Sequence, residues 1–255
     1  EGKLWESQNE VESFSRSQRI DIKRKKFNVT IIEKTSDPRI KYELFQRINS
    51  LGTRLSDQEL RNCAIIMVNK QFYERIHNLS QYEPFQNCIC LSDNDQDKAY
   101  DMELVLRFLI FRHFNETPLP SNINIADYLT EKALEIAESP EYNIENEEKT
   151  FRQTFDLLNE YLGELSFKRY DATKNKFEGK FLVTVFETIS IGLANNIDEW
   201  LSMREEGREI KALLTQRAKD LWSEEDFTSA IGRGSRYNTR TRILIPLGTK
   251  IFSLS

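Results

Sequence analysis

Apolar residues recur every three or four positions along most of the chain, which is the spacing of an amphipathic helix. A Ser56–Glu59 capping box marks the start of one such segment. The segment 102–114 is apolar nearly all round except for Arg107, so we expect a buried helix there. Further helical patterns cover residues 125–136, 151–162, 181–189 and 210–221. The pattern therefore predicts a mainly helical protein.

A different pattern precedes these helices. Residues 27–32 alternate in character, which predicts a strand. Asp37 and Pro38 are typical of a helix start, and Gly52 is typical of a left-handed turn at a helix end. At the other end of the chain, residues 239–252 predict a last helix that Pro246 must bend or interrupt.

These elements predict an α+β fold that is predominantly α-helical. We expect a small α/β part over residues 1–55 and a helical domain over residues 56–255. With 39% hydrophobic residues among 255, the chain can form a core, which excludes a fully disordered protein. Its 9 Gly and 6 Pro argue against a β-barrel with many turns.

Cysteines and hydropathy favour a cytoplasmic protein. The three cysteines cannot all pair with one another, which is typical of a reducing compartment. No apolar run approaches the roughly 20 residues that a membrane helix needs, so we expect no membrane partner. The chain opens with Glu1 rather than Met, and we expect that an upstream part has been removed.

Charge is distributed unevenly along the chain. Residues 1–62 hold 13 basic and 10 acidic side chains, residues 63–231 hold 18 and 31, and residues 232–255 hold five and none. Basic ends around an acidic middle favour an anionic partner at the ends. The alternative is that the basic ends pair with the acidic body.

Metal binding and nucleophilic catalysis have little support. Asp93, Asp95 and Asp97 resemble the start of a calcium loop, but the later Gly and Glu positions are Lys98 and Leu104. An acidic loop that caps the next helix is the simpler interpretation. Cys88 and Cys90 lack a second ligand pair for zinc, so we predict no metal site and interpret these cysteines as buried and structural. No motif of a hydrolase or P-loop nucleotide site is present.

Basic residues provide the candidate nucleic-acid site. An arginine set with a tyrosine inside it can hold phosphates and stack a base. The C-terminal set consists of Arg233, Arg236, Tyr237, Arg240 and Arg242. A second basic cluster precedes the predicted strand, within residues 16–26. A solvated or internally paired basic face is the alternative for both.

A predicted helix–turn–helix corner near residue 50 gathers further polar residues, Arg47, Asn49, Arg61 and Asn62. One interpretation is structural: Arg47 pairs with a nearby glutamate and Asn49 holds the turn. The other is a phosphate-binding corner, in which an arginine and a free helix N-terminus face an anion.

The same segment resembles a known family. Residues Phe45 to Asn62 are similar to the F-x-R-I-N-x-x-G-x-x-L-s-x-q-E-L-R-N hallmark of the N-terminal domain of GmrSD-type restriction and defence proteins. Weaker similarities cover residues 103–108, 162–167 and 238–243, so the resemblance extends over most of the chain. This family joins a ParB/sulfiredoxin-like nucleotide-binding domain to a helical domain, commonly with a nuclease domain.

The resemblance implies a prokaryotic defence protein that binds DNA and couples to NTP binding or hydrolysis with Mg²⁺. It makes Arg47, Asn49 and Gly52 candidate nucleotide-binding positions. The family's D-G-Q-Q-R nucleotide motif is absent, and Ser17-Gln18-Arg19 does not replace it. No catalytic residue is therefore assigned, no cofactor is evident in the chain itself, and whether the chain is an enzyme stays open.

A second hypothesis comes from a different class of protein. The acidic helical body can be a non-enzymatic interaction module that docks a partner subunit. Under either hypothesis the expected partners include a second copy of the chain or a nuclease subunit or domain.

Overall fold

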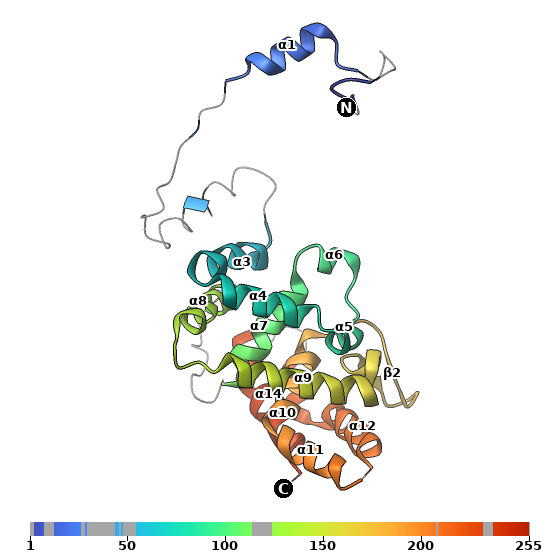
Figure 1. The fold of residues 1–255 in the computed structure, drawn as a ribbon. Helices are drawn as coiled ribbons and strands as arrows, with labels where there is room; N and C mark the ends of the chain where they lie inside the picture. Colours follow the sequence, from blue (N-terminus) through green and yellow to red (C-terminus); the bar gives the residue numbers. More distant parts are fainter. Residues whose placement is uncertain are drawn as a thin grey trace. The chain divides into compact units, whose positions relative to one another are not determined.

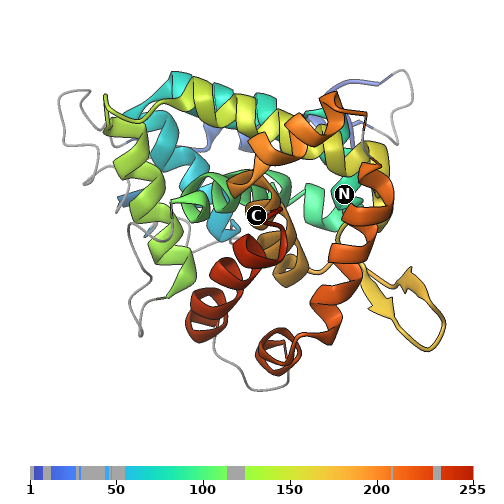
Figure 2. The same ribbon diagram turned by 90° about the horizontal axis from the view of Figure 1, so that it is seen from below.

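A computed structural model describes residues 3–7, 13–26, 29, 44, 45, 47, 55–113, 124–207, 209–231 and 237–254. The chain divides into two compact units, Glu1–Lys41 and Tyr42–Ser255. Figure 1 shows the elements coloured along the sequence, and Figure 2 shows them from below.

The first unit contains the short helix α1 (Arg16–Arg24). Ser15 and Gln18 form a reciprocal capping box at its start, which explains why the helix begins there. None of the helix residues is buried. Trp5 contacts Phe14 edge to face, and the Lys23 ammonium lies 5.6 Å from the Trp5 ring centre.

The second unit is mostly helical, as the sequence predicts. Its α-helices are α3 (Asp57–Val68), α4 (Lys70–Ser80), α5 (Glu83–Ile89), α6 (Asp93–Gln96), α7 (Tyr100–Arg112), α8 (Ile125–Glu138), α9 (Ile144–Tyr161), α10 (Val183–Asn195), α11 (Ile197–Glu205), α12 (Ile210–Asp220), α13 (Glu225–Ala230) and α14 (Tyr237–Ile251). Two 3₁₀ turns, η2 (Gly163–Leu165) and η3 (Leu221–Ser223), connect some of them. The Ser56–Glu59 capping box is confirmed, with both reciprocal bonds at the start of α3.

Helices α7 and α10 form the centre of this unit. All but two residues of α10 are buried, and α7 is buried over most of its length, which confirms the expected buried helix near residues 102–114. Phenylalanines from four helices meet around them, with ring centres 4.4 to 6.5 Å apart: Phe85, Phe108, Phe151, Phe155 and Phe186. Aromatic pairs prefer particular ring orientations, so these contacts stabilise the core beyond the burial of apolar area alone.

Helices α10 and α14 pack unusually close together. A Cβ atom added to Gly192 would lie 2.5 Å from the Gly248 carbonyl carbon, and one added to Gly248 would overlap the carbonyl oxygen of Thr188. Only glycine fits at these two positions. Pro246 lies inside α14, so the last predicted helix exists and contains its proline.

A short antiparallel hairpin, β1 (Arg169–Asp171) and β2 (Lys176–Glu178), leads into α10. It projects at the edge of the unit in both views (Figure 1, Figure 2). The Asp171 carboxylate accepts hydrogen bonds from the amides of Thr173 and Lys174, and Asn175 adopts a left-handed φ of 50°. Each strand spans three residues, too few to show an alternation, so the sequence analysis missed the hairpin.

Several elements expected from the sequence lie outside the described residues, and one expected helix cap is not formed. Apart from the exposed Val29, the predicted strand at 27–32 lies outside the described residues, as do the helix start at Asp37 and the turn at Gly52. The domain boundary near residue 55 stays a prediction. The acidic stretch at 93–97 does not cap α7. It forms α6, while α7 begins after Ala99, a left-handed residue without a side-chain cap. Across the described part of the chain, no helix is long and apolar enough to cross a membrane.

Candidate functional site

The structure describes only some of the residues nominated from the sequence. Arg47 is exposed, whereas Asn49, Gly52, Arg233 and Arg236 lie outside the described residues. Tyr237 begins α14, and its side chain is not described. Of the C-terminal set, Arg240 is half-buried and Arg242 is exposed on α14. The candidate nucleotide corner therefore stays a prediction.

Arg61, which we placed in that corner, is fully buried at 0% exposure. Its guanidinium donates to Thr130 Oγ1 and to the Ala126 carbonyl oxygen, each at 3.2 Å, and to the Gln58 side chain. It also lies 3.5 Å from the Glu103 carboxylate. All of these partners belong to the helical core, so the phosphate-binding interpretation is wrong for Arg61.

Arg61 belongs to a buried charge cluster with Glu103, Arg107 and Glu187. Arg107 is 2.6 Å from Glu103 and 2.7 Å from Glu187, so the two arginines and two glutamates neutralise one another. Burial lowers the pKa of Arg61, although Glu103 opposes the shift. The cluster joins α3, α7 and α10, and we interpret it as structural.

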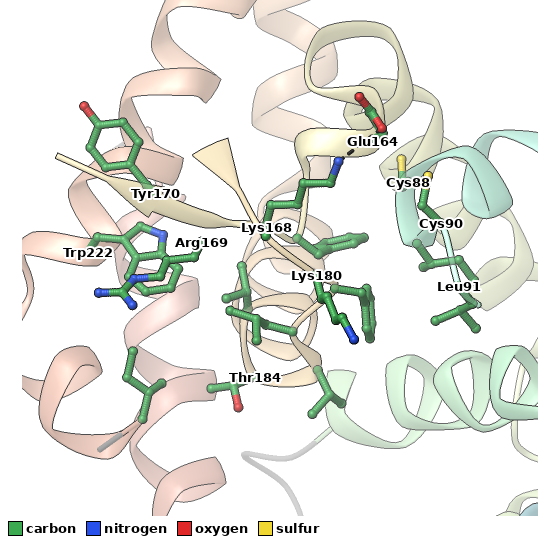
Figure 3. A pocket seen from close by; sticks show the side chains of 18 of the residues that line it. Cys88, Cys90, Leu91, Glu164, Lys168, Arg169, Tyr170, Lys180, Thr184 and Trp222 are labelled. Atoms are coloured by element: carbon green, nitrogen blue, oxygen red, sulfur yellow. Dashed lines mark hydrogen bonds and ion pairs between the residues drawn. The ribbon is translucent and has the colours of Figure 1, made fainter. Parts of the chain in front are cut away.

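A large cavity of about 1500 Å³ lies beside the hairpin. The hairpin, the loop after α5, the start of α10 and parts of α13 and α14 surround it. Four basic residues line it: Lys168, Arg169, Lys180 and Arg240. We call this cavity the basic pocket. In Figure 3, Cys88 and Cys90 border it on one side and Arg169 and Trp222 on the other.

Three acidic residues also line the basic pocket, and each is engaged locally: Asp95, Glu164 and Asp171. Asp95 accepts a hydrogen bond from the Ser92 hydroxyl at 2.7 Å. Glu164 is 3.1 Å from Lys168, a pair drawn as a dashed line in Figure 3. Asp171 accepts from backbone amides of its own turn, and the Lys174 amide is the main cause of its lowered pKa. Arg169 and Lys180, by contrast, have no ion-pair partner within the described structure.

The first turn of α10 also opens to the basic pocket. Val183, Thr184 and Val185 line the cavity, and their backbone N–H groups find no hydrogen-bond acceptor in the described part of the protein. Leu182 at the N-cap supplies no side-chain cap, and the first turn contains no acidic residue. Among the described residues, nothing compensates the positive end of this 13-residue helix dipole.

The pocket lining also contains two cysteines, Cys88 and Cys90, and the indole of Trp222. Burial raises the pKa of the Cys88 thiol to about 12, so this cysteine is protonated at neutral pH and is a poor thiolate nucleophile. The expectation of buried cysteines holds for Cys88 but is wrong for Cys90, which is exposed. The indole N–H of Trp222 is buried without an acceptor among the described atoms.

The sequence analysis missed three of the four basic residues of this pocket. A signal was present, because residues 168–180 contain five lysines and arginines: Lys168, Arg169, Lys174, Lys176 and Lys180. The C-terminal arginines form a similar basic cluster in the sequence. The structure unites the two groups through Arg240.

No set of three or more histidine, cysteine or acidic residues in the described regions could hold a metal ion. His113, at the end of α7, lies 3.3 Å from the buried Glu147 carboxylate, which Arg112 also binds.

Comparisons with protein-family models, with curated proteins and with solved structures give no match for this chain.

Proposed function

We propose that this protein is a GmrSD-type defence protein that binds DNA, with the basic pocket as a contact for the phosphate backbone. One observation carries the DNA-binding part. Arg240, nominated from the sequence as a phosphate contact, lines the same cavity as Lys168, Arg169 and Lys180. Lysine and arginine gathered from separate segments are typical of phosphate recognition.

The remaining parts of this proposal rest on the resemblance alone. They are a ParB-like α/β part near the N-terminus, NTP with Mg²⁺ as the nucleotide, a nuclease subunit or a second copy as partner, and a cytoplasmic location. The residues that would test the nucleotide corner, Asn49 and Gly52, lie outside the described structure. We assign no catalytic step to the chain.

DNA binding can be measured by fluorescence anisotropy with duplex and single-stranded oligonucleotides at low salt. We expect binding that Arg169→Gln, Lys180→Gln and Arg240→Gln together weaken equally for unrelated sequences. If three phosphate contacts form, affinity falls roughly 40-fold between 50 and 200 mM salt. The matched control removes three exposed lysines outside the pocket, Lys70, Lys149 and Lys211, and should change affinity little.

Two results would contradict this proposal. Absence of binding at about 50 mM salt rejects DNA as the partner, because non-specific contacts are strongest at low salt. An equal loss in the control variant shows that overall charge, rather than the pocket, attracts DNA. Indifference to DNA together with a concentration-dependent complex in light scattering would favour the interaction-module hypothesis instead.

A further inference from the structure

We propose that the first turn of α10 is a phosphate-binding site. The phosphate would accept hydrogen bonds from the N–H groups of Val183, Thr184 and Val185 and from the Thr184 hydroxyl. Lys180 and Arg240 would supply positive charge. The site stands on its own geometry and rests on the proposed function only for the source of the phosphate, a free nucleotide or a DNA strand.

The first turn of α10 presents backbone donors to the cavity. The first N–H groups of any helix lack a partner inside the helix. In α10 the residues that carry three of them line the cavity, and the described chain offers these groups no acceptor. Converging N–H groups at the positive end of a helix dipole suit a phosphate oxygen.

The Thr184 side chain is an independent observation. It is only 8% exposed, yet its hydroxyl has no hydrogen-bond partner in the described structure. Thr188, one turn later, donates to the Thr184 carbonyl oxygen, as buried helix threonines usually do. Thr184 makes no such bond at the helix start, and it lies among the side chains that line the pocket (Figure 3). The side chain is nearly buried, yet its hydroxyl is not enclosed by the protein, so it is free to bond a ligand in the cavity.

Charge and size indicate which ligand fits. The exposed Lys180 has no acidic partner among the residues described, and Arg240 lines the same cavity. At about 1500 Å³ the cavity is far larger than one phosphate group. We therefore expect the phosphate of a nucleotide, with room for the attached nucleoside.

The test is an NMR titration of the full chain with inorganic phosphate, a deoxynucleoside monophosphate and a short single strand with or without a 5′-phosphate. In the wild type, the amide signals of Val183, Thr184 and Val185 should shift with each phosphorylated ligand. Thr184→Val should weaken phosphate binding about tenfold or more, because it removes a hydrogen bond to a charged group. Lys180→Gln should weaken binding as well and reduce its salt dependence.

Thr228→Val is the matched control. Thr228 lines the same cavity, but its hydroxyl already donates to carbonyl oxygens of Glu224 and Glu225. This variant should bind phosphate like the wild type. Circular dichroism establishes that each variant is folded, and Lys180→Gln, at an exposed position, tests the site if Thr184→Val fails to fold.

The outcomes separate this site from the proposed function. Unshifted α10 amides, or equal losses for Thr184→Val and Thr228→Val, would overturn the site even if the protein binds DNA elsewhere. Shifts with phosphate and the mononucleotide but not with any strand would support the site and identify a free nucleotide as the source. Shifts that require the strand, whether or not it carries a 5′-phosphate, would support the site with the DNA backbone as the source.

Discussion

Arg61 lies at the C-terminal end of the segment 45–62, on which the proposed GmrSD resemblance rests, and it is completely buried. Gln58, Thr130 and Glu103 use its donors within the helical core. Gln58 in turn donates to Asn62 at 2.6 Å, so the motif residues also bind one another. The second half of this motif thus builds the core rather than a ligand site.

We expect Arg61→Met to destabilise the protein by about 3 kcal/mol, because it leaves buried polar partners without a donor. Urea denaturation followed by circular dichroism measures this loss. Arg75→Met is the matched control, since Arg75 is 37% exposed and pairs with glutamates at the surface. Its loss should stay within about 1 kcal/mol. Equal midpoints for the two variants would refute the structural role of Arg61.

At the scale of elements, α10 and α14 depend on two glycines. Gly192 and Gly248 let the two backbones approach at distances that no side chain allows. Asn196 strengthens the contact by donating to the Thr249 carbonyl oxygen at 2.9 Å. Because α10 also carries the candidate phosphate site, the packing of α14 helps to position the first turn of α10.

Gly248→Ala tests this packing, because close packing predicts that the substitution lowers the stability of the protein rather than raising it. In an exposed helix the change from glycine to alanine stabilises by about 1 kcal/mol. Here we expect a loss of roughly 2 kcal/mol or more, because the new methyl group would overlap the Thr188 carbonyl oxygen.

Thermal unfolding measures the effect, and Ser202→Ala on the exposed side of α11 is the control, with little change expected. A raised melting temperature for Gly248→Ala would show that the two helices are not in close contact.

The whole second unit, Tyr42–Ser255, is organised around α7 and α10. The basic pocket lies toward the hairpin, where segments near residues 90, 170, 182 and 240 meet. A site assembled from such distant segments exists only when the unit is folded.

Hydrogen exchange should reflect this organisation. Amides of α10 beyond its first turn should exchange only through global unfolding, because all but two of its residues are buried. The hairpin β1–β2 should exchange much faster, since its strands have three residues each and none of them is buried. Mass spectrometry of exchanged peptides measures both rates. A hairpin as slow as α10 would contradict this hierarchy.

Helical periodicity allowed much of the fold to be predicted. The capping box at Ser56, the buried helix near 102–114 and the segment that became α12 appeared in the sequence because capping and amphipathic spacing are local properties. The hairpin was missed, because its stability comes from its turn and from the contacts of Tyr170 with Phe177 and Lys219.

The sequence by itself determined the helical class of the second unit, the starts of several helices and the basic character of the C-terminal segment. Only the tertiary structure decided which polar residues face a cavity and which are buried. Arg61 and Arg240 are both arginines near motif residues, yet one is neutralised in the core and the other lines a pocket. The physical reason is that burial and partnership depend on contacts between distant segments, which local spacing does not encode.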